Sequence, residues 1–370
     1  MEKRNRMPIM QIGNIKTDIP VIQGGMGVGV SLSGLASAVA EQGGIGVIAA
    51  AGIGMMEPDY QKNFKKANEQ ALRREIRQAK AGTSGAIGVN IMVALSDYET
   101  LLLTAVDEGA DVIFMGAGLP LKVPGILTPE RMEKEALNIV PIVSSARAAD
   151  LILKSWSRKG CFPVAMVVEG PKAGGHLGFK REELEDPEFD LAKLLPPVIR
   201  TVAWYEEQYN ITIPVIAAGG IYTGADIKSY LDMGASGVQM ATRFVTTEEC
   251  DAAPVFKQSY VDADRKDMVI IDSPVGLPGR AVRNQFLCDV AEGQKKPFRC
   301  SWKCLRTCNF KQVSYCIASA LTNAKLGKLD KGFVFGGANA YRAKAITTVK
   351  EVFDSLCTEY REAAAAAGAV

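Results

Sequence analysis

The sequence is poor in histidine, in net charge and in long apolar runs, and these shortages exclude whole classes of protein. A net charge of +2 over 370 residues gives no electrostatic reason to bind nucleic acid or an anionic membrane. The most apolar stretch, residues 43–56, is too short and too rich in glycine to span a bilayer. The polar first eight residues lead into no signal-peptide pattern. We therefore expect a cytoplasmic globular protein without a membrane or nucleic-acid partner.

The shortage of histidine makes one residue conspicuous. His176 is the only histidine, so a single side chain has an unperturbed pKa near neutrality. Gly174, Gly175 and Gly178 flank it, and glycines let a backbone approach a ligand closely. A buried structural histidine would more usually lie among large apolar residues. The pattern favours a catalytic histidine, with a structural one as the alternative.

Short apolar runs recur along the first two thirds of the chain, and all but the last precede a segment with helical patterning. Continuous rather than alternating apolarity is typical of strands buried on both faces, which form a parallel sheet. Eight such units in about 225 residues predict a closed (β/α)8 TIM barrel, with a doubly wound open sheet as the alternative. The runs cover residues 20–24, 44–50, 86–91, 111–118, 138–143, 163–169, 214–220 and 237–243.

The sequence changes character after the eighth run. Residues 251–370 mix polar and helical patterns and contain a cluster of cysteines. We expect an α/β protein of two parts, a barrel over residues 1–250 and a mostly helical C-terminal appendage over 251–370. The appendage would carry the cysteine cluster and cover the active-site face of the barrel.

Glycines and polar residues gather at the carboxyl ends of the predicted strands, which is where barrels of this kind build their active sites. Residues 23–26, Asn90, residues 116–118, residues 169–176, residues 219–220 and residues 242–243 all occupy such positions. The turn at Gly219 and Gly220, before a helix beginning near Thr223, offers backbone amides to an anion. Loops after strands seven and eight form the recurrent phosphate site of the fold, so a phosphorylated ligand is expected. The chain has no Walker loop.

The motifs at these strand ends resemble a known family. Over roughly residues 15–250 the chain is similar to the FMN-dependent nitronate monooxygenases and to the related flavin-containing enoyl-acyl-carrier-protein reductases. The motifs that carry the resemblance are Pro20-Val-Ile-Gln-Gly-Gly-Met26, Gly88-Val-Asn-Ile-Met92, Glu169-Gly-x-x-Ala-Gly-Gly-His-x-Gly178, Pro214-Val-Ile-Ala-Ala-Gly-Gly-Ile221 and Gly234-Ala-x-Gly-Val-Gln-Met-Ala-Thr-Arg-Phe244.

The resemblance implies FMN as cofactor and assigns residues to it. Gly24, Gly25, Met26 and Asn90 would line the isoalloxazine, and Gly174 and Gly175 would pack close to the flavin. Gly219, Gly220, Gln239, Thr242 and Arg243 would hold the ribityl chain and the phosphate. The neighbouring strand-end positions Gly116, Glu169, Ala218, Met240 and Ala241 complete the expected cofactor-binding set.

By the same resemblance, His176 is the catalytic residue, either a base or a substrate anchor. A neutral imidazole can remove a proton from the carbon beside a nitro group, and a protonated one can hydrogen-bond a carbonyl oxygen during hydride addition. Relatives also return a glycine-rich segment to the open face of the flavin, here residues 336–341, so Asn339 or Tyr341 could reach substrate. A simple turn is the alternative.

Half of the eight cysteines lie within 17 residues, at Cys300, Cys304, Cys308 and Cys316. Four thiolates at these spacings can converge on one centre, and no histidine lies nearby to share it. A [4Fe–4S] cluster is therefore favoured over structural zinc, whose usual Cys-x-x-Cys knuckles are missing; free or redox-active thiols remain open. The surrounding cations could offset thiolate charge or dock an acidic electron donor: Lys295, Lys296, Arg299, Lys303, Arg306 and Lys311.

Together these patterns favour an FMN-dependent oxidoreductase acting on a small-molecule substrate. We favour reduction of an activated carbon–carbon double bond in an enone or enoyl substrate, because a cysteine cluster offers a route for electrons. Oxidation of alkyl nitronates with O2 is the near alternative, and a non-catalytic flavin- or metal-binding scaffold is a third. NAD(P)H or a ferredoxin-type protein would supply electrons, and a homo-oligomer is among the states left open.

Overall fold

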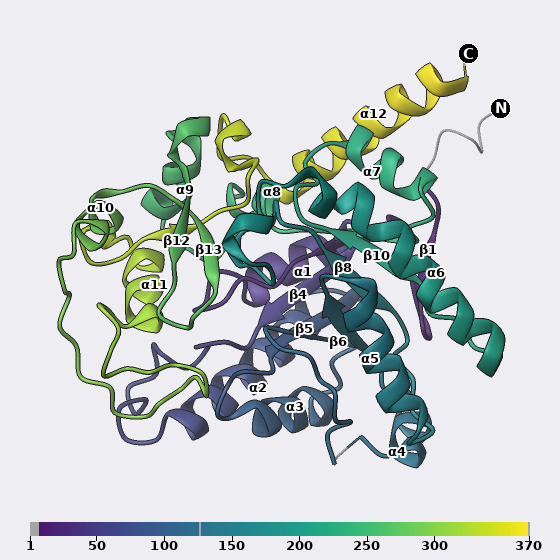
Figure 1. Ribbon diagram of the computed structural model, residues 1–370, viewed down its shortest axis with the longest axis horizontal. Coiled ribbons are helices and arrows are strands. Elements are labelled where there is room, and N and C mark those ends of the chain that lie inside the picture. Colours follow the sequence, from purple (N-terminus) through teal and green to yellow (C-terminus); the bar gives the residue numbers. More distant parts are fainter. Residues whose placement is uncertain (1–6, 126, 369–370) are drawn as a thin grey trace.

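The protein, seen in a computed structural model, is built around a closed barrel of eight parallel strands (Figure 1). The structure describes residues 7–125 and 127–368, so most of the polar N-terminal stretch lies outside it. The barrel confirms the predicted (β/α)8 fold, and each strand falls within one of the apolar runs or overlaps it by all but one residue. The strands are β3 (Val21–Gln23), β4 (Ile45–Ala49), β5 (Ala86–Met92), β6 (Val112–Gly116), β7 (Ile139–Val143), β8 (Met166–Glu169), β10 (Val215–Ala218) and β11 (Gly237–Met240).

Helices follow the barrel strands and cover the outside of the barrel. They are α1 (Ser33–Glu41), α2 (Phe64–Gly82), α3 (Tyr98–Asp107), α4 (Pro129–Lys134), α5 (Ala146–Ser157), α6 (Leu191–Tyr209), α7 (Gly224–Asp232) and the short α8 (Thr242–Val245). Buried residues on α1 and α2, such as Leu35 and Leu72, belong to the core between helices and barrel. None of the helices in the described part of the chain has both the length and the apolarity needed to cross a membrane.

The C-terminal region contributes to the barrel as well as covering it. Besides α9 (Pro254–Val261), α10 (Gln285–Ala291) and α11 (Ile317–Lys325), it contains α12 (Val349–Gly368), which packs along α7 and touches α1 (Figure 1). The approach is close, because a Cβ on Gly224 would lie 2.1 Å from the carbonyl oxygen of Leu356. α12 therefore occupies the outer-ring position that the four-residue α8 is too short to fill.

The barrel is closed at the amino ends of its strands by a hairpin, β1 (Met10–Ile12) with β2 (Ile15–Thr17). Met10 and Ile12 are buried together with inward-facing residues of the barrel, including Phe114 and Ile216. This end is therefore filled with apolar side chains, and the other end of the barrel is left for a site.

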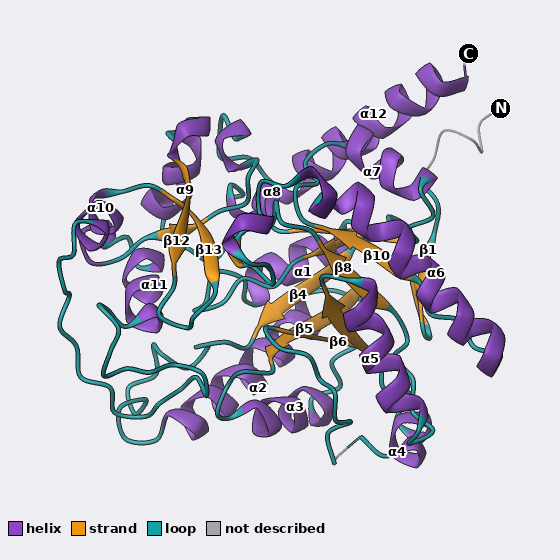
Figure 2. Ribbon diagram, in the orientation of Figure 1, coloured by secondary structure: helices purple, strands orange, loops and turns teal. Residues whose placement is uncertain are grey.

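A small antiparallel sheet in the C-terminal region was not predicted. Figure 2 shows its strands apart from those of the barrel: β12 (Met268–Asp272), β13 (Pro278–Val282) and, paired with β13, β14 (Val334–Phe335). The two-residue strand β9 (Gly175–His176) also pairs with β13, setting His176 opposite Gly279. The strands are too short to give a recognisable alternation, yet they fix the backbone of the sole histidine.

Strand register brings the polar strand ends to one rim. Ala218 lies beside Glu169 on one side and beside Gln239 on the other. Gln23 pairs with Met240, Ala49 with Asn90, and Met92 with Gly116. Because the carboxyl ends of all eight strands face the same way, these residues surround one opening.

Candidate active site

A cavity of about 820 Å³ opens at the carboxyl ends of the barrel strands. Its base is formed by residues that end the strands, which we call the strand-end wall: Gly24, Asn90, Gly116, Glu169, Gly219 and Met240. His176 and every residue of the expected cofactor-binding set except Arg243 line this one cavity. Residues from all eight βα units thus meet where the sequence predicted a ligand site.

Gly219 and Gly220 form a tight turn that only glycine tolerates well. Their φ angles are +94° and +88°, and a Cβ on Gly219 would lie 2.7 Å from the carbonyl oxygen of Gly170. Neither amide hydrogen, nor that of Thr242, has an acceptor among the described residues. Three donors are therefore available to an anion at this corner of the cavity.

The amides at the start of α7 do not add to these donors. Asp226 accepts hydrogen bonds from the amides of Tyr222 and Thr223 at 2.9 Å each. Glu359 of α12 accepts the amide of Gly224 at 2.7 Å. The helix start is thus already satisfied by carboxylates, one of which comes from a helix more than a hundred residues later.

Arg243 is the expected cofactor residue that the structure does not bring to the cavity. Its guanidinium donates to the carbonyl of Tyr222 at 3.1 Å and lies 4.8 Å from the centre of the Tyr222 ring. It also approaches Glu359 at 4.0 Å. The side chain therefore ties the phosphate-side loops to α12.

Asn90 is the polar residue of the strand-end wall with an unused acceptor. Its buried Oδ1 has no hydrogen-bond partner, and a Cβ on Gly25 would lie 2.5 Å from the Asn90 Cβ.

Gln23 belongs to the first strand-end motif, and the sequence predicted no role for its side chain. Its buried side chain donates to the carbonyl of Gly24 at 2.6 Å and accepts from the amide of Val47 at 3.0 Å. Gln23 therefore holds the Gly24–Gly25 turn in place.

The glycine-rich segment at residues 336–341 reaches the cavity, which is one of the two arrangements expected for it from the sequence. A Cβ on Gly174 would lie 2.6 Å from the amide nitrogen of Gly337, so the two segments touch through their backbones. Asn339 donates from Nδ2 to the carbonyl of Gly220 at 2.6 Å and lines the cavity. Tyr341 does not line it. Lys172, at the cavity edge, pairs with Asp190 at 2.8 Å.

His176 faces the cavity from the loop after β8, and the C-terminal region holds it. Its Nε2 lies 2.6 Å from the Oγ of Ser273, and its ring meets the edge of Phe335 with centroids 5.0 Å apart. Burial lowers the pKa of His176 from 6.5 to about 4. The imidazole is therefore neutral at physiological pH and can act as a base or as a neutral hydrogen-bond partner.

The loop that carries His176 is clamped by a buried arginine. Arg280, on β13, donates to the carbonyl oxygens of Pro171 and Ala173, the second at 2.9 Å. No carboxylate in the described part of the chain forms an ion pair with it, and burial lowers the pKa of its guanidinium. Ser273 and Arg280 were missed by the sequence analysis because they lie about a hundred residues beyond the motif they support.

Glu169 is the ionisable group of the strand-end wall. It ends β8 and lines the cavity, and its carboxylate has no hydrogen-bond partner among the described residues. Burial raises the pKa of Glu169 from 4.5 to about 7. A carboxyl group that is partly protonated at neutral pH can give or take a proton in the cavity.

The cysteine segment forms the far side of the same cavity. The amide of Ser96 donates to the carbonyl of Cys304 at 3.0 Å, and Leu95 and Leu305 form an isolated β-bridge. Burial, followed by the negative charges of the other three thiolates, raises the pKa of Cys304 to about 12. The four cysteines are thus near one another, but among the described residues they form no group arranged to hold a metal.

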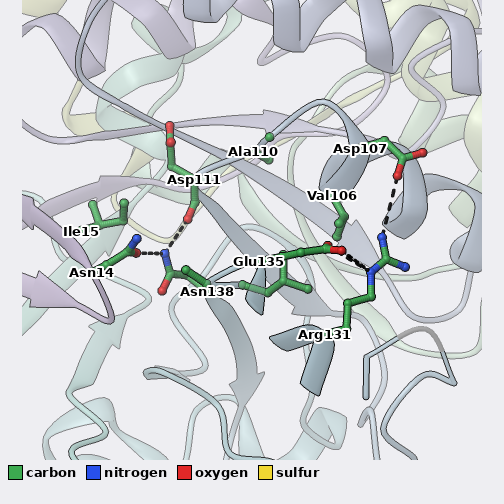
Figure 3. Close-up of a pocket in the computed structure, with 12 residues that line it drawn as sticks. Asn14, Ile15, Val106, Asp107, Ala110, Asp111, Arg131, Glu135 and Asn138 are labelled. Carbon is green, nitrogen blue, oxygen red and sulfur yellow. Dashed lines mark hydrogen bonds and ion pairs between the residues drawn. The ribbon is translucent and has the colours of Figure 1, made fainter. Parts of the chain in front are cut away.

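A second cavity, of about 410 Å³, lies at the opposite end of the barrel (Figure 3). Its polar groups bind one another: Asn138 donates to Asn14 at 2.5 Å and to the carbonyl of Asp111 at 2.8 Å, and Arg131 pairs with Glu135 at 3.0 Å. These residues precede β6 and β7, at the face where barrels carry stability rather than chemistry. We assign this cavity no function.

Comparison with known proteins identifies the family. The sequence model of the nitronate monooxygenases matches residues 9–101 and 91–359, most of the chain. The chain belongs to the nitronate monooxygenase family. It is therefore an oxidoreductase of an FMN-dependent family that acts on small molecules, as the strand-end motifs predicted.

Several relatives of this family member have different activities. It is 28% identical over 292 residues to (3aS,4S,5R,7aS)-5-hydroxy-7a-methyl-1-oxo-octahydro-1H-indene-4-carboxyl-CoA dehydrogenase of Mycobacterium tuberculosis, covering 79% of this chain and 70% of the relative. It is 25% identical over 321 residues to a probable nitronate monooxygenase of Staphylococcus aureus, covering 79% and 82%. The name of the family thus leaves the reaction of this member open.

Solved structures agree with the fold over nearly the whole chain. FabK of Thermotoga maritima aligns with a TM-score of 0.74 at 27% identity, covering 96% of each chain. Nitroalkane oxidase of Streptomyces ansochromogenes aligns with a TM-score of 0.71 at 22% identity, covering 95% of this chain and 98% of that one. The second likeness supports the fold alone.

Proposed function

We propose that this protein uses FMN to reduce an activated carbon–carbon double bond in an enone or enoyl substrate. The observation that carries the proposal is the pairing of Glu169, whose pKa is near 7, with a neutral His176 in one cavity. Reduction of such a bond adds a hydride to one carbon and a proton to the other, so it needs a proton donor. Oxidation of an anionic nitronate does not require a proton donor for its first step. The likeness to FabK, an enoyl-acyl-carrier-protein reductase, also supports this choice.

The residues of the cavity fit FMN. The free amides of Gly219, Gly220 and Thr242 suit its phosphate, and the glycine turns leave room for backbone to approach a planar ring. The unpartnered Oδ1 of Asn90 can accept a hydrogen bond from a ring N–H. When bound, FMN supplies the hydride for the reaction. Gly24, Gly25, Met26, Gly116, Gly174, Gly175, Ala218, Gln239, Met240 and Ala241 complete the proposed binding set.

His176 and Glu169 have separate roles in this proposal. His176, neutral and held by Ser273, hydrogen-bonds the activating carbonyl oxygen and fixes the orientation of the substrate. Glu169, in its protonated form, delivers the proton to the carbon beside that carbonyl. The electrons come from NAD(P)H or a ferredoxin-type donor.

The test is an anaerobic assay of the purified holoenzyme. The flavin is reduced with dithionite, the reductant is removed, and its reoxidation is followed with a panel of enones, enoyl thioesters and nitronates. Reoxidation by an enone or enoyl thioester, with the saturated product found by mass spectrometry, supports the proposal. A protein that turns over propionate 3-nitronate with O2 and oxidises its flavin with no enone or enoyl thioester overturns it.

Nitronate oxidation is the second candidate, and one observation favours it. A neutral imidazole facing the cavity is the form of histidine able to remove a proton from the carbon of a nitroalkane. This reading needs His176 as the base and leaves Glu169 without a role. The variant Glu169→Gln separates the two: it slows enone reduction if Glu169 is the proton donor and leaves nitronate oxidation unchanged.

We further propose that Cys300, Cys304, Cys308 and Cys316 bind a [4Fe–4S] cluster, with zinc as the alternative. The four cysteines lie within 17 residues, and the negative charges of neighbouring thiolates contribute, after burial, to raising the pKa of Cys304 and of Cys308; both observations support the proposal. The test is the absorption spectrum and the iron and zinc content of anaerobically purified protein. Cys308→Ser removes the metal and retains flavin, whereas the control Cys357→Ser, a cysteine outside the segment, changes neither. Equal metal content in Cys308→Ser and the natural protein overturns the assignment.

A further inference from the structure

The cavity continues past the strand-end wall to a second polar group that the proposed reaction does not use. We call this part the distal end and define it by Tyr60, Asn68, Asp97, Cys304 and Leu305, all of which line the cavity. Asp97 is only 3% exposed, although its side chain is an acid. Buried acids are ordinarily paired or hydrogen-bonded at both oxygens, so this position requires an explanation.

Asp97 departs from the behaviour expected at its place in the fold. It stands at the N-cap of α3, where an aspartate normally accepts a hydrogen bond from the first turn of the helix, but its side chain makes no capping bond. Instead Oδ2 accepts from the Nδ2 of Asn68 at 2.8 Å, and Oδ1 is buried without a partner. Asn68 is itself fixed, since its Oδ1 accepts the amide of Gly54 at 2.8 Å.

The distal end is closed by apolar and aromatic side chains. Tyr60, 4% exposed, meets the edge of Trp302 with ring centroids 4.9 Å apart. Its hydroxyl makes no hydrogen bond within the described residues, and Tyr60 lines the same cavity as Asp97. Leu305 pairs with Leu95 beside it. A ligand reaching this end would therefore find one free acceptor and one free donor.

We propose that Asp97 and Tyr60 bind a hydroxyl group at the end of the substrate farthest from its reacting carbon. The placement of the reacting carbon rests on the proposed function; the binding of the hydroxyl does not. A hydroxyl donates one hydrogen bond and accepts another, which matches the free Oδ1 of Asp97 and the Tyr60 hydroxyl. An ammonium cannot accept a hydrogen bond and loses more hydration when it is buried.

Binding, rather than turnover, tests this inference. The probes are saturated thioesters of N-acetylcysteamine in a chain-length series, each with either a terminal hydroxyl, a terminal amine or a terminal methyl group. Affinity for the holoenzyme is measured by isothermal titration calorimetry. At the matching chain length, the terminal hydroxyl should bind about 10-fold more tightly than the methyl, as expected for a hydrogen bond to a buried carboxylate.

Three variants locate the effect. Asp97→Leu should abolish the preference for the hydroxyl, and Tyr60→Phe, which keeps the ring that packs on Trp302, should reduce it. Asp107→Asn, an exposed acid at the end of the same helix, serves as the control and should retain it. Where Asp97→Leu does not fold, Tyr60→Phe against Asp107→Asn decides.

Three results overturn the inference: no preference at any chain length, a preference that survives both distal-end variants, or tighter binding of the terminal amine. Saturated thioesters are not substrates for reduction, so these outcomes do not depend on the proposed reaction. A protein that prefers the hydroxyl and reduces no double bond retains this site and loses the proposed function. A protein that reduces a double bond but shows no preference for the hydroxyl retains the proposed function and loses this site.

Discussion

The two ends of the cavity are built in different ways. The strand-end wall consists of residues at, or directly after, the carboxyl ends of barrel strands, each positioned by the strand that carries it. The distal end consists of side chains from four separate segments, the loop before α2, α2 itself, the start of α3 and the cysteine segment. The first is suited to the cofactor of an FMN-dependent family. The second is suited to the features of one substrate.

The difference also governs how each end responds to change. Gly219 in the strand-end wall is required both by its φ of +94° and by the carbonyl oxygen of Gly170, so a side chain there disturbs the turn itself. At the distal end, Asp97 and Tyr60 can be altered with little backbone strain, because their contacts are made by side chains. We therefore expect substitutions at the strand-end wall to affect chemistry and cofactor, and those at the distal end to affect the choice of ligand.

The largest effect is expected at His176. His176→Ala should lower turnover by ~10²–10⁴-fold with either candidate substrate class, because it removes the group that orients the substrate or takes its proton. FMN content should be unchanged, since the phosphate corner lies on other loops. The measurement is kcat/KM together with the flavin-to-protein ratio. Tyr60→Phe is the matched control from the distal end, and an equal loss of turnover there would break the distinction between the two ends.

The fold and the strand-end wall could be predicted from sequence because their signals are local. Eight apolar runs, six of them with glycine or polar residues at their carboxyl ends, predict both the strands and the rim on which Asn90, Glu169 and Gly219 meet. The glycine-rich return at residues 336–341 was expected only from the family resemblance, and the position of Asn339 favours it.

What could not be predicted depends on contacts between distant segments. Ser273 and Arg280 support the His176 loop only because β13 pairs with β9. Asp97 leaves the cap of α3 unmade because its Oδ2 accepts a hydrogen bond from Asn68 of α2 instead. Nothing local shows that Glu359 of α12 accepts the amide of Gly224 at the start of α7. Arg243 matched a family motif, yet Tyr222 and α12 draw its side chain away.

The pH dependence of stability should reveal the two buried ionisable groups of the cavity as opposite slopes. Burial lowers the pKa of His176 from 6.5 to about 4, so the unfolded chain takes up this proton first and the free energy of unfolding decreases as pH falls through that range. Burial raises the pKa of Glu169 from 4.5 to about 7, so the free energy of unfolding decreases as pH rises through that range. Each contribution amounts to about 3 kcal/mol over its full range.

Between pH 4.5 and 6.5 the two contributions oppose each other in the apoprotein. His176→Gln should make the free energy of unfolding fall more steeply as pH rises, and Glu169→Gln should make it rise. Urea unfolding across this range measures both slopes. Parallel curves for the natural apoprotein and both variants would show that neither group is desolvated as the closed cavity requires.

A smaller effect is expected at the phosphate corner, where the backbone should matter more than the nearby cation. Gly220→Val places a branched side chain at φ +88° and against Lys172, and should weaken FMN binding by about 10- to 100-fold. Arg243→Ala removes contacts to Tyr222 and Glu359 outside the cavity and should lower thermal stability with less effect on FMN. Equilibrium dialysis of FMN against the apoproteins compares them. Greater loss of FMN in Arg243→Ala than in Gly220→Val would show that the Arg243 guanidinium contacts the phosphate.

The smallest effect is expected at Ser273, which acts on substrate through His176 rather than by touching it. Ser273→Ala removes the hydroxyl 2.6 Å from Nε2, so the imidazole loses one fixed orientation while its burial and its packing on Phe335 persist. Turnover should fall by about 10-fold, because a mispositioned group retains part of its catalytic effect. The loss should appear in kcat more than in KM, and Ser273→Thr, which keeps a hydroxyl, should restore most of it. A merely structural serine would lower stability in both variants and leave kcat of the folded fraction unchanged, so the ratio of the two kcat values decides whether the C-terminal sheet positions the histidine or only covers it.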